Sequence, residues 1–203
     1  MSGETRRTAD FPLLNCLITG VGGQGTVLLS RLIGEAALRK GMDVRGSETI
    51  GMAQRGGSVV SHLRIGTGSF SPLIPPEKAD LIIAFECAEA LRTLPFLAPA
   101  GNMLTLDRVL SPAYKAADMT ACLRTCLGGR LTVVSWEKFI ERFDPRVSNV
   151  LLLGKAIGMG FLPFSPAEII TVLKERSSPR YLEMNIRALN SGLSPTLFKS
   201  KAV

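Results

Sequence analysis

The chain has 203 residues, of which 46% are hydrophobic and 20% are charged, which is enough for one substantial core and short for two. Lys and Arg number 24 against 17 Asp and Glu, and the formal net charge of +7 favours an acidic ligand or partner. No basic run exceeds two residues, and two Tyr and one Trp offer little for stacking on bases. The composition therefore argues against nucleic-acid binding, and ordinary solvated surface remains the plainer reading of the charge.

The sequence also bears on where in the cell the protein is expected. It has no run of about 18 apolar residues, which a membrane-spanning helix would need, and residues 1–10 lack the apolar centre of a signal peptide. We therefore expect a cytoplasmic protein without membrane contact, in which the four cysteines are reduced. Cys122 and Cys126, one helical turn apart, are predicted to be small buried residues rather than ligands of a soft metal.

Strands and helices alternate along most of the chain. An apolar run at 13–19 predicts a buried strand, and 23–40 predicts a helix that ends at Gly41 and carries apolar side chains near one face (Val27, Leu28, Leu32, Ala36 and Leu38). A strand at 43–48 completes a β-α-β unit, and the β-rich segment 58–65 is expected to be an added, antiparallel strand. Further strands are predicted at 80–85, 102–106 and 131–134, and further helices at 87–94, 115–127, 149–159, 166–174 and 180–190.

This order predicts an α/β fold with a single open, mostly parallel Rossmann-like sheet that helices cover. Residues 13–193 are expected to form one domain, after a flexible N-terminal segment (1–12) and before a C-terminal tail (194–203). In such sheets, ligands bind beyond the carboxyl ends of the strands.

The most informative motif is the glycine loop at residues 20–25, Gly-Val-Gly-Gly-Gln-Gly, between the first strand and the first helix. Glycines allow a sharp turn, and the N–H groups at the start of the helix favour a phosphate or carboxylate. The extra polar Gln24 adds an amide that can contact a neighbouring loop or a ligand. A dinucleotide site would also need an acid about 20 residues further on, and Glu48 lies in that range. A tight structural turn is the alternative.

A second glycine-rich segment, 51–57, places Arg55 beside Gly56 and Gly57 directly after a strand. An arginine there presents a bidentate fork to phosphate or carboxylate. A glycine-rich surface turn is the plainer alternative. His62 is predicted to be a core or edge residue, because no nucleophile motif points to it as a base.

The two motifs together resemble the gamma-type domain of the 2-oxoacid:ferredoxin oxidoreductases. The segment 48–57, Glu-Thr-Ile-Gly-Met-Ala-Gln-Arg-Gly-Gly, is most similar to the beta subunits of the indolepyruvate members of that family. The likeness continues through 79–84 and 149–154 and into 185–192, so it covers nearly the whole chain.

The resemblance implies a subunit of a complex that decarboxylates an aryl pyruvate, passes electrons to ferredoxin and forms an acyl-coenzyme A. Thiamine diphosphate and [4Fe-4S] clusters are expected on a large partner subunit, because this sequence lacks their motifs. This chain is not expected to be active alone. The resemblance associates its domain with subunit packing and coenzyme A, and it implies these contact residues: Gly20, Gly22, Gly23, Gln24, Gly25, Arg55, Gly56 and Gly57. No catalytic or metal-binding residue is predicted.

Two other functions stay open on the sequence alone. The first is a stand-alone NAD(P)- or nucleotide-binding module that uses the glycine loop and Glu48. The second is a purely structural subunit in which both glycine-rich segments serve protein contacts.

Overall fold

The computed structural model describes residues 11–50, 57–68, 70–198 and 200. Within these residues one sheet is formed by six strands: β1 (Leu14–Val21), β2 (Asp43–Ile50), β3 (Ser58–Gly66), β4 (Ala79–Ala84), β5 (Leu97–Leu106) and β6 (Leu131–Val134). The α-helices are α1 (Thr26–Arg39), α2 (Cys87–Thr93), α3 (Ala116–Leu127), α4 (Trp136–Ile140), α5 (Ser148–Gly158), α6 (Pro166–Arg176) and α7 (Pro179–Leu193). Short 3-10 helices lie at Leu94–Phe96, Gly128–Arg130 and Pro145–Val147.

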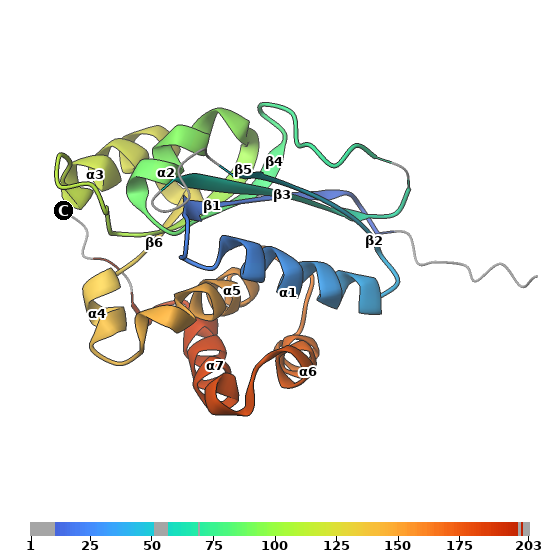
Figure 1. The fold of residues 1–203 in the computed structure, drawn as a ribbon. Coiled ribbons are helices and arrows are strands. Elements are labelled where there is room, and N and C mark those ends of the chain that lie inside the picture. The colour runs from blue at the N-terminus through green and yellow to red at the C-terminus, as the bar shows by residue number, and fades with distance from the viewer. Residues whose placement is uncertain (1–10, 51–56, 69, 199, 201–203) are drawn as a thin grey trace, which may run out of the picture.

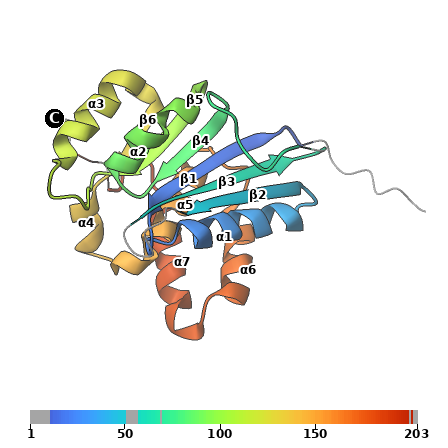
Figure 2. The ribbon, with the colours of Figure 1, turned by 45° about the horizontal axis from the view of Figure 1, so that its top comes forward.

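The strand order is β2-β3-β1-β4-β5-β6, as Figure 2 shows. Strands β1, β4, β5 and β6 are parallel neighbours, whereas β3 runs antiparallel to both β1 and β2. The predicted fold, a mostly parallel sheet with an antiparallel added strand, is confirmed. The sequence predicts a β-α-β unit over 13–48. Its two strands, β1 and β2, do run parallel, but they are not neighbours because β3 lies between them.

Helices cover both faces of the sheet (Figure 1): α2 and α3 lie on one face, α1 and α5 on the other, and α6 and α7 pack beneath α1 and α5. The core is accordingly divided in two. Ile18, Leu29 and Leu152 belong to the cluster on the α1 side, and Leu17 and Leu123 belong to the cluster on the α2 side. Alternate residues of β1 thus enter opposite clusters, as expected for a strand buried on both faces.

Two local expectations are wrong, and one helix was not expected. Leu28 and Leu38 of α1 are 48% and 61% exposed, because the buried face of that helix is centred on Leu29 and Ile33 instead. Cys122 and Cys126 are exposed, since α3 packs through other residues (Thr120, Leu123 and Leu127). The five-residue helix α4 was not expected; Ser135 caps it by accepting a hydrogen bond from the Lys138 N–H.

The segment after α7 packs on the domain. The buried Lys155 ammonium of α5 donates to the carbonyls of Ser194, Pro195 and Leu197 at 2.6, 3.0 and 3.2 Å. Phe198 is buried, and its carbonyl accepts from the Ser135 N–H at 2.7 Å. Within the described residues, no helix has both the length and the apolar character needed to cross a bilayer.

Helices α5 and α7 pack so closely that their backbones are in contact. A Cβ added at Gly192 of α7 would lie 2.3 Å from the Leu151 carbonyl oxygen, and one added at Gly154 of α5 would lie 2.2 Å from the Leu189 carbonyl oxygen. Because backbone cannot move aside as a side chain can, these glycines set the distance between the two helices.

We predict that Gly192→Ala lowers the free energy of unfolding by about 1–3 kcal/mol, the usual cost of overpacking a close contact. Urea denaturation followed by circular dichroism measures it. Gly129→Ala is the matched control, because a Cβ there meets nothing within 4 Å. Equal stability of the two variants would contradict the close contact of α5 and α7.

His62 is a core residue, as predicted. It is 7% exposed on β3, its Nδ1 accepts a hydrogen bond from the Ile74 N–H at 3.2 Å, and its ring packs edge-on against Phe96. Burial lowers the pKa of His62, so the neutral imidazole is the form that the fold holds.

The chain has a single histidine, so its contribution to stability can be isolated. Because the folded-state pKa lies below the unfolded value, unfolding takes up a proton, and stability falls as pH drops below about 6.5. We predict that His62→Asn, which retains an acceptor for the Ile74 N–H, removes this part of the pH dependence. Unfolding in urea at pH 7.5 and pH 5.5 tests it; an unchanged difference between the two pH values would refute it.

Candidate functional site

The two glycine-rich segments meet at the carboxyl edge of the sheet. The Gly22 N–H donates to the Gly57 carbonyl at 3.0 Å, and Val21, at the end of β1, pairs with Ser58, at the start of β3. This contact follows from the antiparallel insertion of β3, whose first residue must lie beside the last residue of β1. Gly57 therefore lies next to the first loop. Arg55 and Gly56 lie outside the described residues.

The glycine loop is a rigid turn. Gly23 and Gly25 have φ values of 95° and 90°, which side-chain-bearing residues rarely adopt. Gly20 is required for space, because a Cβ there would lie 2.6 Å from the Gln24 Oε1 atom. That oxygen accepts from the Val21 N–H at 2.8 Å, and the Gln24 N–H donates to the Val21 carbonyl at 3.1 Å.

Gln24 thus closes its own loop, which is a local role that the sequence did not indicate. Its amide nitrogen Nε2 is buried and has no hydrogen-bond partner among the residues that the structure describes. A buried unpaired donor costs about 1–3 kcal/mol. Within the described residues, the Gln24 amide therefore keeps a buried donor without a partner.

Two helices begin at this loop. Helix α1 starts at Thr26, directly after Gly25, with no side chain capping its first turn. Asn149, the second residue of α5, packs against the loop so closely that a Cβ on Gly25 would lie 2.9 Å from its Nδ2 atom. The second residue of α5 thus lies beside the start of α1, whose partial positive charge favours an anion.

Asn149 was assigned no role from the sequence, although it opens one of the segments that carry the family resemblance. Its spacing from the glycine loop, more than 120 residues, gives no local signal. Only the packing of α5 beside α1 brings it to the site.

Buried carboxylates brace the other side of the loop. Glu89 of α2, 3% exposed, accepts from the Thr19 hydroxyl at 3.2 Å and from the Ser58 hydroxyl, and its other oxygen pairs with Arg92 at 3.2 Å. It therefore ties the end of β1 to the start of β3, and sequence reasoning did not find it.

Glu86, which precedes α2, is 4% exposed and accepts from the Leu110 N–H at 2.8 Å. Burial raises its pKa above the ordinary value for a glutamate, an effect that the Leu110 hydrogen bond opposes. Burial likewise lowers the pKa of Arg108, whose guanidinium lies 4.0 Å from the centre of the Trp136 ring. The acids on the α2 side of the sheet edge thus lie beside cations, Glu89 with Arg92 and Glu86 near Arg108.

Glu48 is not beside the glycine loop. It lies on β2, opposite Ser61 of β3, which in turn pairs with Ile18 of β1. Two strand spacings, about 10 Å, therefore separate its backbone from β1. Glu48 instead lines a separate cavity between α1 and β2. A dinucleotide site requires its acid on the strand next to the glycine loop, so this geometry argues against that alternative.

The described residues contain no cluster of three or more His, Cys, Asp or Glu side chains arranged to hold a metal. The site therefore consists of backbone N–H groups, two amide side chains and the braced ends of β1 and β3. Such an arrangement offers hydrogen-bond donors of the kind that an anionic ligand accepts.

Comparison with known proteins agrees with this fold and with the motifs. The sequence profile of the family described as pyruvate ferredoxin/flavodoxin oxidoreductase matches residues 15–194. The indolepyruvate oxidoreductase subunit IorB of Thermococcus kodakarensis is 34% identical over 189 residues, a match that covers 88% of this chain and 94% of that protein.

Solved structures show the same fold at lower identity. The gamma subunit of a keto/oxoacid ferredoxin oxidoreductase from Geobacter sulfurreducens superimposes with a TM-score of 0.68 at 18% identity, covering 93% of this chain and 99% of that one. The 2-oxoglutarate:ferredoxin oxidoreductase of Magnetococcus marinus, solved with 2-oxoglutarate, coenzyme A and succinyl-CoA bound, gives a TM-score of 0.69 at 18% identity. In that case the match covers 93% of this chain and 32% of the longer one.

Proposed function

The chain belongs to the pyruvate ferredoxin/flavodoxin oxidoreductase family, and we propose that it is the small subunit of an indolepyruvate, or aryl pyruvate, oxidoreductase complex that reduces ferredoxin. The proposed substrate class rests on relatives from several archaea, all named indolepyruvate oxidoreductase subunit IorB and 31–34% identical to this chain. The matches cover 94–96% of the length of those relatives.

In this proposal the redox chemistry belongs to a larger partner subunit. Thiamine diphosphate there would carry the decarboxylation, and [4Fe-4S] clusters would carry electrons to ferredoxin. The sequence of this chain has no Cys-x-x-Cys and no other spacing suited to such a cluster. This chain would contribute subunit packing and binding of coenzyme A, the acceptor of the acyl group.

One observation carries the coenzyme A assignment: the hydrogen bond of 3.0 Å between the Gly22 N–H and the Gly57 carbonyl, which joins the two glycine-rich segments at the start of α1. Coenzyme A is a polyanion with a diphosphate and a ribose 3′-phosphate. The residues fit its diphosphate, because the start of α1 has no side-chain cap and the Nε2 of Gln24 has no partner among the described residues. Arg55, two residues before Gly57, would add a bidentate contact.

The site residues of the proposal are therefore those that the sequence indicated, with one addition. Gly20, Gly23 and Gly25 shape the loop, Gly22 and Gly57 hold the two segments together, and Gln24 both closes the loop and donates. Asn149, which the sequence reasoning did not single out, joins them from α5.

We predict that the purified chain alone has no oxidoreductase activity and that adding the large subunit produces indolepyruvate- and coenzyme A-dependent reduction of ferredoxin or a viologen dye. The measurement is the initial rate at several molar ratios of the two chains. Equal activity of the large subunit without this chain would refute the proposed role.

We predict that Arg55→Ala raises the KM for coenzyme A in the reconstituted complex about tenfold, the equivalent of about 1.4 kcal/mol of lost charge-assisted hydrogen bonding. The kcat should change little, because the residue is assigned to binding. Arg45→Ala removes a cation from the neighbouring strand β2 and serves as the control. An unchanged KM would remove Arg55 from the site, and calorimetry with NAD in parallel would reveal a dinucleotide module instead.

A further inference from the structure

The β2 side of the sheet presents an edge that the described part of the chain leaves open. β2 is the outermost strand there, with α1 beneath it (Figure 2). Among the described residues it pairs with β3 alone, so the backbone N–H and C=O groups of its outer edge can pair with a further strand. A groove of about 680 Å³ between α1 and β2 lies along this edge.

The outward side of α1 has a self-complementary order of side chains. Of the α1 residues that line the groove, those that are not buried are Leu28, Arg31, Glu35 and Leu38. Positions 28 and 38 are equally far from Ile33, and so are positions 31 and 35. When a second α1 packs antiparallel about this centre, each leucine therefore meets a leucine, and each arginine meets a glutamate.

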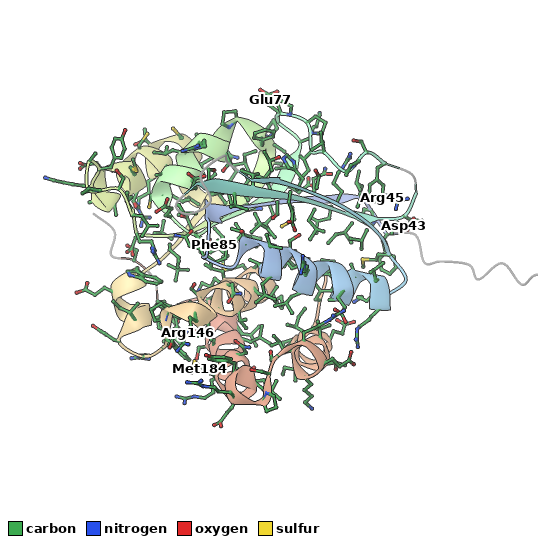
Figure 3. All side chains as sticks on the ribbon, viewed as in Figure 1. Asp43, Arg45, Glu77, Phe85, Arg146 and Met184 are labelled. Atoms are coloured by element: carbon green, nitrogen blue, oxygen red, sulfur yellow. The ribbon has the colours of Figure 1, made fainter. Side chains whose placement is uncertain are left out.

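The charges of β2 are arranged about the same level of the molecule. Val44 packs against the middle of α1, since a Cβ on Gly34 would lie 3.4 Å from the Val44 Cγ1 atom. Asp43 and Arg45 flank Val44, so they lie on the other face of the strand, away from α1. Figure 3 shows both at the right-hand end of the sheet. In an antiparallel pair of β2 strands centred on Val44, Asp43 of each copy lies opposite Arg45 of the other.

One two-fold axis accounts for all of these pairings. The centre of the α1 pairs, Ile33, and the centre of the β2 pairs, Val44, lie side by side because the next residue of α1, Gly34, packs on Val44. An axis perpendicular to the sheet at this level reverses the direction of both elements and keeps both copies of α1 on one face. The leucine pairs and both kinds of ion pair then each form twice, as in an isologous interface.

Charged side chains on an edge strand usually block association, because a charge meets the same charge of a second copy. At this edge the effect is the opposite, since a cation and an anion stand at equal distances on either side of Val44. Among the described residues, neither Arg31 nor Arg45 forms an ion pair, so both cations are available to a second copy.

The two carboxylates can also accept a further donor. Asp43 accepts from the Gly68 N–H at 3.0 Å through Oδ2. Glu35 accepts from Arg39 at 3.0 Å through Oε1 and from Arg176 at 2.6 Å through Oε2. A carboxylate has about four lone-pair positions, so each of these groups keeps room for an arginine from a second copy.

We propose that this edge is an interface between two copies of the chain, formed by β2 and the outward side of α1 around a two-fold axis at Val44. A second copy is the partner that fits, because each group of the face meets its counterpart from the same set of groups. The glycine loop precedes α1, whereas this interface is centred on the middle of the helix. The inference therefore does not rest on the proposed function.

The first test reverses charge in the full chain, with the molar mass measured by sedimentation equilibrium. The unaltered chain should be a dimer. Arg45→Asp places two aspartates opposite each other and should raise the dissociation constant about tenfold, because two ion pairs become two repulsive pairs. Adding Asp43→Arg to that variant restores opposite charges and should restore the dimer. A monomeric unaltered chain, or a double variant that dissociates as readily as Arg45→Asp, would overturn the proposal.

The second test concerns the apolar pairs. Leu38→Glu places a carboxylate on the outward side of α1. Leu110→Glu is the matched control, because Leu110 is also exposed but follows β5, which lies across β1 from β2. At concentrations where the unaltered chain is a dimer, Leu38→Glu should be monomeric and Leu110→Glu dimeric, with circular dichroism showing that both are folded. Equal molar masses of the two variants would contradict the proposed interface.

A different occupant of this edge gives a different result. If the chain alone is monomeric and Leu38→Glu weakens its binding to the large subunit, the edge belongs to the large subunit, and the proposal is wrong. The proposed function fails separately: a dimer that depends on Arg45 and Leu38, in a complex that does not need this chain to use coenzyme A, would leave the interface standing and refute that function.

Discussion

The rest of the site depends on one backbone hydrogen bond, from the Gly22 N–H to the Gly57 carbonyl. It exists because β3 enters the sheet antiparallel between β1 and β2, so the chain returns to the carboxyl edge at the point where β1 leaves it. In a sheet with β2 beside β1, the end of the second glycine-rich segment would lie one strand further from the loop. Strand order therefore decides that two motifs more than 30 residues apart form one site.

Much of the fold was predictable, because its signals are local. The buried run at 80–85, the helix signal that ends at Gly41 and the β-rich segment 58–65 predict these elements and the antiparallel strand from the sequence alone. The position of β3 between β1 and β2 was not predictable, since no local pattern encodes which strands become neighbours. The exposed Leu28 and Leu38 were misplaced for a related reason: the second layer of helices, α6 and α7, decides which face of α1 is covered.

Some residues of the candidate site can likewise be predicted from the sequence, and others cannot. The glycines of the loop were predictable, because φ values of 90–95° and a Cβ clash leave few alternatives to glycine. Asn149 and Glu89 were not, because each reaches the site through packing between elements far apart in the chain. Glu89 shows the difficulty clearly. As one acid in a short helix it looks like ordinary surface, yet its carboxylate bridges the hydroxyls of Thr19 and Ser58.

The buried Glu86 and Glu89 lie near a site proposed to bind an anion, where negative charge would be unfavourable. Their cationic neighbours remove this difficulty. Glu89 faces Arg92, and Glu86 lies near Arg108, so the α2 side of the sheet edge is compensated within itself. On the other side, the side chain that packs against Gly25 at the start of α1 is the neutral amide of Asn149. The close contact between α5 and α7 at Gly154 and Gly192 also affects the candidate site. It fixes the position of α5, hence of Asn149, and so transmits the packing of the C-terminal helices to the start of α1, where the anion is expected.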